Sequence, residues 1–480
     1  MSENKRITVA FGDGIGPEIT KAALDIMKAA KVPLEYDIIE VGKEVYLKGI
    51  TSGIPTEAWD TIIKNKVLLK GPITTPQGGG YKSLNVTLRK ALGLFANVRN
   101  CKAYTPFVQS FHPSMDLTII RENEEDLYAG IEHRQTSEVV QVLKLITRPG
   151  SESIIRYAFE YARAFGRKKV TCMTKDNIMK HTDGLFHRVF DEIAEEYPDL
   201  KHDHQIIDIG AARLAAQPES LDVIVTLNLY GDILSDIAAQ VAGSVGLAGS
   251  ANIGREAAMF EAIHGSAPDI AGLGVANPSG LLKASVEMLV HLGLPTYAEL
   301  IKNAWLVTLE DGIHTADIYN PTFSTREVGT QAFTEAVIER LGRKPDQLRA
   351  VNYEATKELH LELKPTPERK KELVGVDIFL DWHEEGRQAE ILGKKLEELC
   401  DDDLKLKMIT NRGVMVYPRG LRQTFKTDHW RCRFTGQGKV DYRWVIALMN
   451  RMIESGLEVI KTENLYTFHG EQGFSQAQGE

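Results

Sequence analysis

The chain has 480 residues, which is too long for one compact domain and predicts about two to four domains. Apolar residues make up 43% of the chain and charged residues 26%, as in globular proteins that bury a large core. The formal net charge of −9 argues against a nucleic-acid-binding protein that works through a general basic field. No apolar run approaches the roughly 18 residues that a membrane-spanning helix needs, so we expect no membrane segment.

The cysteines and the first residues predict a cytoplasmic protein. Cys101, Cys172, Cys400 and Cys432 lie far apart and form neither a CxxC pair nor a disulfide framework. The chain runs from a short charged stretch directly into a strand, without the apolar core of a signal peptide. We therefore expect a reducing, cytoplasmic setting.

Strands and helices alternate along the first two thirds of the chain. Residues 5–12 predict a strand, the glycines of GDGIGPE a turn, and residues 19–32 an amphipathic helix. The alternation continues with a helix at 151–165 and strands at 66–71, 116–123, 168–174 and 221–232. This order is typical of an α/β fold, in which polar residues after the strands form ligand crevices.

The C-terminal part predicts a separate domain. Residues 343–375 are polar, mix both charges and carry prolines at 365 and 367, which indicates a linker or an exposed helical connection. From residue 375 onward the predicted order is β-α-β-β-α-β, which is typical of a ferredoxin-like α+β domain.

The turn GDGIGPE at 12–18 is weak evidence for a ligand site. Its glycines could cradle a phosphate at the following helix. However, the spacing differs from the dinucleotide fingerprint G-x-G-x-x-G, and a plain tight turn explains it equally well.

A cluster of polar residues between 70 and 101 indicates a site for a small polycarboxylate. Ser83, Asn85 and Arg89 lead into a predicted helix, and Arg99 follows ten residues later. Arginine binds carboxylates through two parallel hydrogen bonds, and short polar side chains suit the remaining oxygens. A capped helix start with surface arginines explains these residues about equally well.

Arg121 and Tyr128 favour the ligand-site interpretation. Arg121 ends an apolar strand, which is an unusual position for a merely solvated charge. Tyr128 follows seven residues later, and an ordinary half-buried aromatic remains the alternative for it. Lys175, Asn177 and Lys180 again follow a strand, where a lysine is either a base, a charge clamp or a surface residue.

Three aspartates indicate a divalent-metal site. Asp232 and Asp236 are spaced to share one helix face, where two like charges destabilise a bare helix unless a cation joins them. With Asp208, which ends another strand, they would form the hard-oxygen site that Mg²⁺ or Mn²⁺ prefers. Aspartates placed near a helix N-terminus by its dipole are the alternative.

The loop at 261–280 is rich in glycine and alanine and contains His264, Asp269 and Asn277. Such a loop can approach a nucleotide closely. An acidic residue there would accept hydrogen bonds from ribose hydroxyls and reject a 2′-phosphate. A structural histidine is the alternative for His264.

The ordered motifs resemble the isocitrate/isopropylmalate (β-decarboxylating) dehydrogenase family over residues 5–345. They are GDGIGPE, KGPITTP, SLNVTLR, NVR, RENEEDLYAG, KDNIMK, NLYGDILSD and HGSAPDIAG. Residues 346–480, with RGVMVYP, DHWRCRF and GFSQAQG, resemble an extra C-terminal domain that some bacterial isocitrate-oxidising members carry.

The resemblance implies a two-domain α/β fold that differs from an ordinary Rossmann fold, followed by the ferredoxin-like domain. The implied parts are a large domain with the nucleotide site (1–94 and 243–346), a small domain (95–242) with a dimer clasp (about 128–150), a linker (347–374) and the C-terminal domain (375–480).

The resemblance also assigns roles to the polar residues. The implied isocitrate-binding residues are Ser83, Asn85, Arg89, Arg99, Arg121 and Asn177, and the implied catalytic residues are Tyr128 and Lys175. Asp208, Asp232 and Asp236 would hold the metal, and Thr75, His264 and Asn277 would contact the nucleotide. Lys175 and Asp208 would reach into the neighbouring subunit's site, which implies a homodimer or a larger homo-oligomer.

The hydrogen-bonding Ser83 and Asn85 favour isocitrate over 3-isopropylmalate, with homoisocitrate as the second choice. Asp269 and Ile270 stand where NADP-using relatives carry Lys-Tyr, and Asp317 and Pro321 replace a later tyrosine and arginine. Acidic residues beside the adenosine ribose repel a phosphate, so we expect NAD. The C-terminal domain is expected to support oligomers, with ligand-binding regulation as the alternative.

Overall fold

The computed structural model describes residues 4–75, 83–353, 365 and 368–478. Within these residues the contacts divide the chain into two compact units. Unit 1 comprises residues 1–128, 145–178 and 183–363, and unit 2 comprises 129–144, 179–182 and 364–480. Much of the predicted linker at 347–374 lies outside the described residues, and the predicted division of the first 346 residues into two domains stays a prediction.

Ten strands of the described chain form the sheet of unit 1. In spatial order they are β2 (Leu34–Ile39), β1 (Lys5–Ala10), β3 (Val67–Lys70), β12 (Ala258–Ala262), β11 (Gly249–Ile253), β4 (Ala96–Lys102), β5 (Asp116–Glu122), β10 (Val223–Thr226), β8 (Lys169–Thr174) and β9 (Lys201–Ile206). The outer strands pair in parallel, whereas β12, β11, β4 and β5 pair antiparallel with one another. The sheet therefore contains both parallel and antiparallel pairs. Together with its helices it forms the α/β fold that the sequence predicted.

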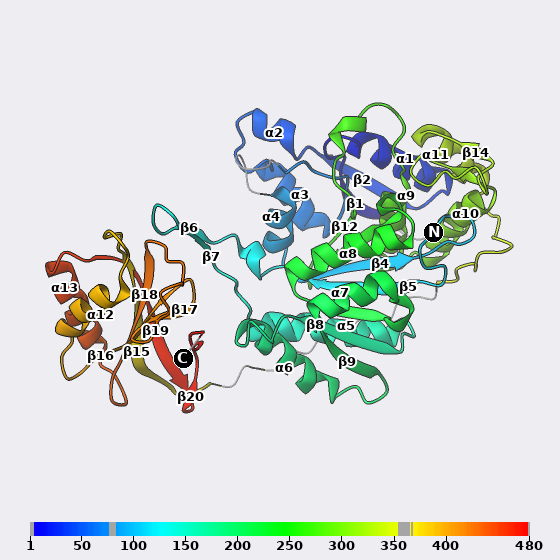
Figure 1. Ribbon diagram of the computed structural model, residues 1–480. Helices are drawn as coiled ribbons and strands as arrows, with labels where there is room; N and C mark the ends of the chain where they lie inside the picture. The colour runs from blue at the N-terminus through cyan, green and yellow to red at the C-terminus, as the bar shows by residue number, and fades with distance from the viewer. Residues whose placement is uncertain (1–3, 76–82, 354–364, 366–367, 479–480) are drawn as a thin grey trace. The chain divides into compact units, whose positions relative to one another are not determined.

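Helices cover both faces of this sheet (Figure 1). They are α1 (Gly16–Ala29), α2 (Lys43–Leu47), α3 (Thr56–Asn65), α4 (Leu84–Ala91), α5 (Arg148–Ala164), α6 (Thr182–Ala194), α7 (Ile207–Ala216), α8 (Asn228–Ala242), α9 (Ser279–His291), α10 (Pro295–Glu310) and α11 (Thr330–Glu339). Short strands β13 (Ile313–His314) and β14 (Arg326–Glu327) pair separately. Among the described residues, no helix is both long enough and apolar enough to cross a membrane.

The strand predicted at 221–232 is shorter than expected. β10 ends at Thr226 and α8 begins two residues later, so Asp232 already lies in the helix. The apolar run continues because the inner face of α8 packs on the sheet through Leu234 and Ala238, which are buried. Apolar continuity across a strand–helix junction cannot by itself locate the junction.

Unit 2 contains the ferredoxin-like fold that the C-terminal sequence predicted. Its elements are β15 (Lys371–Asp381), α12 (Ala389–Glu398), β16 (Lys405–Asn411), β17 (Val414–Tyr417), β18 (His429–Thr435), α13 (Tyr442–Glu454), β19 (Glu458–Phe468) and β20 (Glu471–Gln472). The four principal strands lie in the order β16-β18-β15-β19 and pair antiparallel, with β17 and β20 added at the edges. A buried ion pair joins the neighbouring strands β15 and β18, where Arg433 Nε lies 2.7 Å from Asp377 Oδ1.

A hairpin from the predicted clasp belongs to unit 2. Its strands are β6 (Glu132–Arg134) and β7 (Val140–Val142). The Thr136 hydroxyl donates to Asp428 Oδ1 over 2.5 Å, and Arg387 Nη1 donates to Glu138 Oε2 over 2.9 Å. The C-terminal domain therefore binds the turn of this hairpin within the same chain.

Candidate active site

Two arginines of the central sheet are almost completely buried. Arg99 on β4 is 3% exposed, and Arg121 on β5 is 0% exposed. Arg121 pairs across the strands with Asn97, so that Arg121, Asn97 and Arg99 point to the same face of the sheet. Burial, followed by the neighbouring arginine charges, lowers the pKa of Arg121 to about 10. Buried guanidinium groups need charged or polar partners, and α8 supplies them.

The N-terminal half of α8 neutralises both arginines. Arg121 Nε and Nη2 donate to Asn228 Oδ1 over 3.0 and 2.8 Å, and Arg121 Nη1 pairs with Asp232. Arg99 Nη2 lies 3.4 Å from Asp232 Oδ1, and Arg99 Nη1 lies 3.7 Å from Asp236 Oδ1. Burial alone would raise the pKa of Asp232, but the charges of Arg121 and Arg99 hold that pKa below its usual value.

Gly231 allows α8 to approach this closely. A Cβ atom at position 231 would lie 2.5 Å from Arg121 Cγ and 2.6 Å from Arg121 Cβ, closer than real side chains come. The glycine therefore makes room for the stem of Arg121 beneath the helix.

Tyr128 joins this cluster from the short 3₁₀ helix Leu127–Ala129. Its hydroxyl donates to Asp232 Oδ2 over 2.5 Å, and the Arg121 guanidinium carbon lies 4.9 Å from the ring centroid. Burial raises the pKa of Tyr128, with Arg121 opposing and Asp232 reinforcing the shift. The phenol therefore stays protonated at neutral pH and is available as a proton donor.

Arg89 is held by a second buried ion cluster. Its Nη2 lies 2.9 Å from Glu261 Oε1, while Lys70 Nζ lies 2.8 Å from Glu261 Oε2. Burial alone would raise the pKa of Glu261, but the charges of Lys70 and Arg89 lower it. Glu261 thus stays ionised and fixes the position of Arg89 at the end of α4.

Ser83 and Asn85 lie at the start of α4. Ser83 is the N-cap residue, and its hydroxyl oxygen accepts a hydrogen bond from Thr75 Oγ1 over 3.3 Å. Asn85 Oδ1 is buried without a hydrogen-bond partner among the described residues. An amide left unsatisfied in this way is suited to a ligand, because its two ends exchange by a simple flip.

Lys175 and Asp208 form a separate pair. Lys175 follows β8, Asp208 lies in the first turn of α7, and Lys175 Nζ lies 2.7 Å from Asp208 Oδ1. The hydrogen bond from Lys175 lowers the pKa of Asp208. Asn177 is exposed nearby in sequence. Among the described residues, no ion pair joins Lys175 to the carboxylates of α8.

One other group of metal-ligand types occurs in the described chain, formed by Asp176, His187 and His204. His187 Nδ1 lies 2.7 Å from Asp176 Oδ2, and the two imidazole rings stack with centroids 3.5 Å apart. The ligand atoms of the three side chains lie within 4.8 Å of one another, and His204 Nε2 is also hydrogen-bonded to Thr174 Oγ1 over 2.8 Å.

Asp317 and Asp269, both predicted to lie beside the nucleotide, have different surroundings in the structure. Asp317 Oδ2 accepts from Ser244 Oγ over 2.7 Å and from Asn277 Nδ2 over 3.0 Å, and Asp317 Oδ1 accepts from Thr315 Oγ1 over 2.6 Å. Asp269 and Ile270 are exposed on the short 3₁₀ helix Pro268–Ile270.

Burial lowers the pKa of His264. The imidazole is therefore neutral at pH 7, and its Nε2 lacks a partner among the described residues.

Sequence reasoning missed four residues that hold the predicted ones in place, namely Lys70, Asn228, Ser235 and Glu261. Each lies inside or beside a recognised motif, and this position was the one feature of the sequence that could have pointed to it. Their partners are far away in the chain, as with Arg121 and Asn228, which are 107 residues apart.

Comparison with known proteins supports the family resemblance. The profile of isocitrate/isopropylmalate dehydrogenases matches residues 6–337, and the profile of the bacterial isocitrate dehydrogenase C-terminal domain matches residues 371–480. A Rickettsia bellii protein named isocitrate dehydrogenase (NADP) is 53% identical over 100% of both chains. A crystal structure from Thermus thermophilus is 46% identical, with a TM-score of 0.92 over 99% of this chain and 96% of that one.

The prediction of an NAD-dependent enzyme is wrong. Relatives from Rickettsia and Thermus thermophilus that align over 99–100% of this chain are named for NADP. A Saccharomyces cerevisiae mitochondrial subunit named for NAD is 48% identical, but over 70% of this chain and 90% of its own length. The prediction rested on Asp269 and Asp317. Asp269 is exposed, and the oxygens of Asp317 accept hydrogen bonds from Ser244, Asn277 and Thr315.

The first profile covers more than half of the chain and the second covers the C-terminal domain, so the chain belongs to the isocitrate/isopropylmalate dehydrogenase family.

Proposed function

We propose that this protein oxidises and decarboxylates isocitrate to 2-oxoglutarate and CO₂ while reducing NADP. The observation that carries the proposal is the cluster of buried Arg99 and Arg121 around Asp232, with Tyr128 donating into the same carboxylate. The full-length relatives named isocitrate dehydrogenase (NADP) support both the substrate and the cofactor.

Isocitrate is a trianion, and three guanidinium groups would neutralise it. Arg89, Arg99 and Arg121 are each less than 9% exposed, so their charges act where water screens poorly. Asp232 neutralises Arg99 and Arg121 in the protein alone. A substrate carboxylate would replace Asp232 at these guanidinium groups, which would leave the aspartate oxygens available for a cation.

Asp232 and Asp236 of α8, with the partner subunit's Asp208, would hold Mg²⁺ or Mn²⁺. The residues fit a hard cation, because the carboxylates of Asp232 and Asp236 project from one helix and both lie beside Arg99. When bound, the cation supplies the Lewis acidity that polarises the hydroxyl and keto oxygens of the substrate.

Two side chains would move the protons. The partner subunit's Lys175, with the help of the aspartate it pairs with, would accept or relay the proton of the substrate hydroxyl while hydride passes to the nicotinamide. Tyr128 would protonate the carbon that loses CO₂, since its raised pKa keeps the phenol protonated. Asn177 beside Lys175 would contact the substrate from the same side.

The nucleotide would lie along the loop at 261–280. Thr75, neutral His264 and Asn277 would contact it, the last through an amide that Asp317 orients. Asp317 also accepts hydrogen bonds from Ser244 and Thr315, so it links Asn277 to two neighbouring segments of the chain.

We also propose a homodimer or larger homo-oligomer in the cytoplasm. The Lys175–Asp208 pair stands apart from the α8 carboxylates within the described chain, which supports a site completed by a second subunit. All four cysteines are free, which supports a reducing compartment. We assign the C-terminal domain a scaffolding role.

Steady-state kinetics that cross NADP and NAD with isocitrate, homoisocitrate and 3-isopropylmalate test the proposed reaction. We expect kcat/KM to be highest with NADP and isocitrate. One charged hydrogen bond contributes about 1.5–3 kcal/mol, so NADP should exceed NAD by roughly tenfold or more. Equal efficiency with the two cofactors, or a preference for another substrate, would contradict the proposal.

Ser83→Asp should reduce kcat/KM for isocitrate far more than Ser83→Ala. An added anion about 4 Å from a substrate carboxylate, at an effective dielectric near 20, is repelled by roughly 4 kcal/mol, or about three orders of magnitude in rate. Ser83→Ala removes one hydrogen bond to a charged group, about 1.5–3 kcal/mol. If the Asp variant is no worse than the Ala variant, Ser83 does not face the substrate.

Gly231→Ala should displace Arg121 and reduce kcat/KM for isocitrate. Overpacking costs about 1–3 kcal/mol, which corresponds to roughly tenfold to a hundredfold here if the displacement falls on the guanidinium group. Gly184→Ala in α6 is the matched control, since its Cβ would meet only the end of the Arg188 side chain. Unchanged kinetics for Gly231→Ala in a folded protein would show that Arg121 needs no such close fit beneath α8.

Mixing inactive Lys175→Ala subunits with inactive Tyr128→Phe subunits should restore part of the activity. If Lys175 serves the neighbouring site, each mixed dimer contains one site with both groups intact. Native mass spectrometry would establish that mixed dimers form. Mixed dimers without activity would show that Lys175 and Tyr128 act within one chain.

A further inference from the structure

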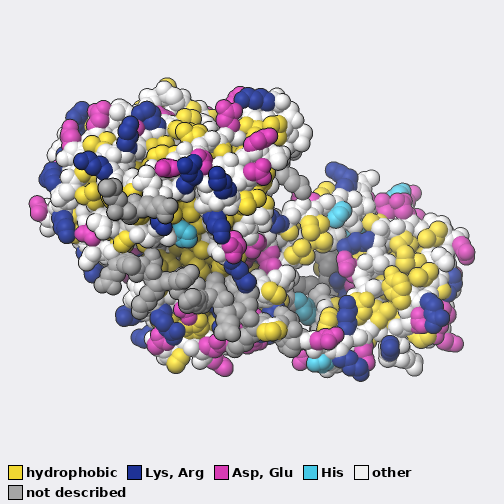
Figure 2. All heavy atoms as spheres, turned by 180° about the vertical axis from the view of Figure 1, so that it is seen from behind, with side chains coloured by type: hydrophobic (Ala, Val, Ile, Leu, Met, Phe, Trp, Pro, Cys, Tyr) yellow, Lys and Arg dark blue, Asp and Glu magenta, His cyan; other side chains and the backbone are white. Residues whose placement is uncertain are grey.

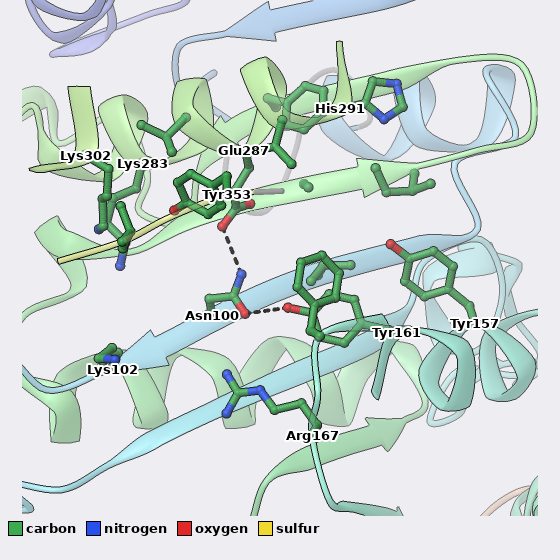
Figure 3. Close-up of a pocket in the computed structure, with 18 of the residues that line it drawn as sticks. Asn100, Lys102, Tyr157, Tyr161, Arg167, Lys283, Glu287, His291, Lys302 and Tyr353 are labelled. Carbon is green, nitrogen blue, oxygen red and sulfur yellow. Dashed lines mark hydrogen bonds between the residues drawn. The ribbon is translucent and has the colours of Figure 1, made fainter. Parts of the chain in front are cut away.

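A large cavity lies on the sheet face opposite the arginine cluster. It has a volume of about 890 Å³ and is bounded by β4, β11, α5, α9 and the segment that reaches Tyr353 (Figure 3). Val98, Asn100 and Lys102 of β4 line it, whereas Arg99 between them points to the other face. The cavity is therefore separate from the proposed active site.

One part of the cavity wall is aromatic and apolar. It is formed by Phe95, Val98, Tyr157, Phe165, Ala251, Ile253, Phe260, Val286 and Val290. Phe95 and Tyr157 meet edge to face with ring centroids 5.8 Å apart, so both rings belong to this apolar part of the wall. Volumes of roughly 300–1,000 Å³ with mostly apolar walls are typical of small-molecule sites.

Two lysines stand at the other part of the wall. Lys283 of α9 and Lys302 of α10 are each 8% exposed, and Figure 3 shows their ammonium groups side by side. Lys302 Nζ donates to Tyr104 Oη over 3.2 Å and lies 3.9 Å from the Trp305 ring centroid. For Lys283 Nζ the described residues provide ring contacts, at 5.3 Å from the Tyr104 centroid, but no hydrogen bond or ion pair.

The nearest acidic side chain does not neutralise these lysines. Glu287 Oε1 accepts from Asn100 Nδ2 over 2.9 Å, and Glu287 Oε2 is buried without a partner among the described residues. No ion pair joins Glu287 to Lys283 or Lys302 within the described chain. Burial lowers the pKa of both lysines, and the charge of Glu287 only opposes that shift.

Of the remaining charged side chains of the cavity wall, Asp116, Lys102 and Arg167 pair with one another, and Arg255 is exposed. Asp116 lies 2.8 Å from Lys102 Nζ and 2.7 Å from Arg167 Nη2, so one carboxylate serves two cations. The wall therefore carries more positive than negative charge, and its excess is concentrated at Lys283 and Lys302. Buried charges without partners are costly, and proteins retain them mainly where a ligand supplies the partner.

We propose that this cavity binds a small organic anion with a flat apolar body. Its carboxylate or phosphate would lie against Lys283 and Lys302, and its body would lie against the ring surfaces of Phe95 and Tyr157. This site is independent of the proposed reaction, since it lies on the other face of the sheet.

Isothermal titration of the full-length protein with 2-naphthoate tests the proposal. We expect saturable binding that is weakened by about tenfold or more in Lys283→Met and in Lys302→Met, since each removes one charge-assisted contact. Glu287→Gln should strengthen binding several-fold, because it removes a carboxylate that repels the ligand. The matched control is Lys344→Met, whose lysine side chain is 69% exposed and should leave the affinity unchanged.

Two further probes test whether binding needs both the anionic group and the apolar body. The neutral analogue 2-naphthalenemethanol should bind at least about tenfold more weakly than 2-naphthoate, because it cannot pair with the lysines. Inorganic phosphate should also bind weakly, because it lacks the apolar body. Equal binding of the neutral analogue, equal binding of phosphate, or no saturable binding of 2-naphthoate would each overturn the proposal.

The Glu287→Gln titration keeps the test decisive if a lysine variant does not fold, since unchanged or weaker binding in that variant also contradicts the proposal. Unchanged affinity in Ser83→Asp would separate this cavity from the active site. A weakened affinity in that variant would assign the binding to the active site instead.

Discussion

The burial of Arg99 and Arg121 in the central sheet is the constraint on which the rest of the site depends. Guanidinium groups 3% and 0% exposed cannot remain ionised there without counter-charges, and α8 provides them through Asp232 and Asp236. This requirement fixes the start of α8 over β4 and β5, and Gly231 makes the close approach sterically possible. Tyr128 is held in the same cluster because Asp232 also accepts its hydrogen bond.

Successive side chains of β4 point to opposite faces of the sheet, so this one strand contributes residues to two different sites. On β4, Asn97 and Arg99 face the proposed active site, while Val98 and Asn100 face the cavity that contains the two buried lysines. Both faces concentrate positive charge, although the chain as a whole carries a net charge of −9. On the surface drawn in Figure 2, basic and acidic side chains are interspersed, so anion binding depends on local pockets rather than a general field.

The error over the cofactor has a physical origin. A sequence shows that position 317 is an aspartate, and an aspartate beside a nucleotide loop is expected to accept hydrogen bonds from ribose. In the folded chain its oxygens accept from Ser244, Asn277 and Thr315, so the carboxylate organises the loop instead. Two of these partners are 73 and 40 residues away in the chain, so the sequence alone did not show them.

The sequence by itself determined the family, the α/β class and the ferredoxin-like C-terminal domain, because motif order and strand–helix alternation are local properties that survive without coordinates. It also identified Ser83, Arg89, Arg121, Tyr128 and the aspartates as polar residues at strand and helix ends, and their catalytic roles stay predictions. Only the tertiary structure decided which of them meet. Only the folded chain shows that Asn228 binds Arg121, and that Glu261 pairs with Arg89 and Lys70. It also brings Lys283 and Lys302 together. Contacts between such distant segments follow from packing and charge neutralisation, which the sequence does not display.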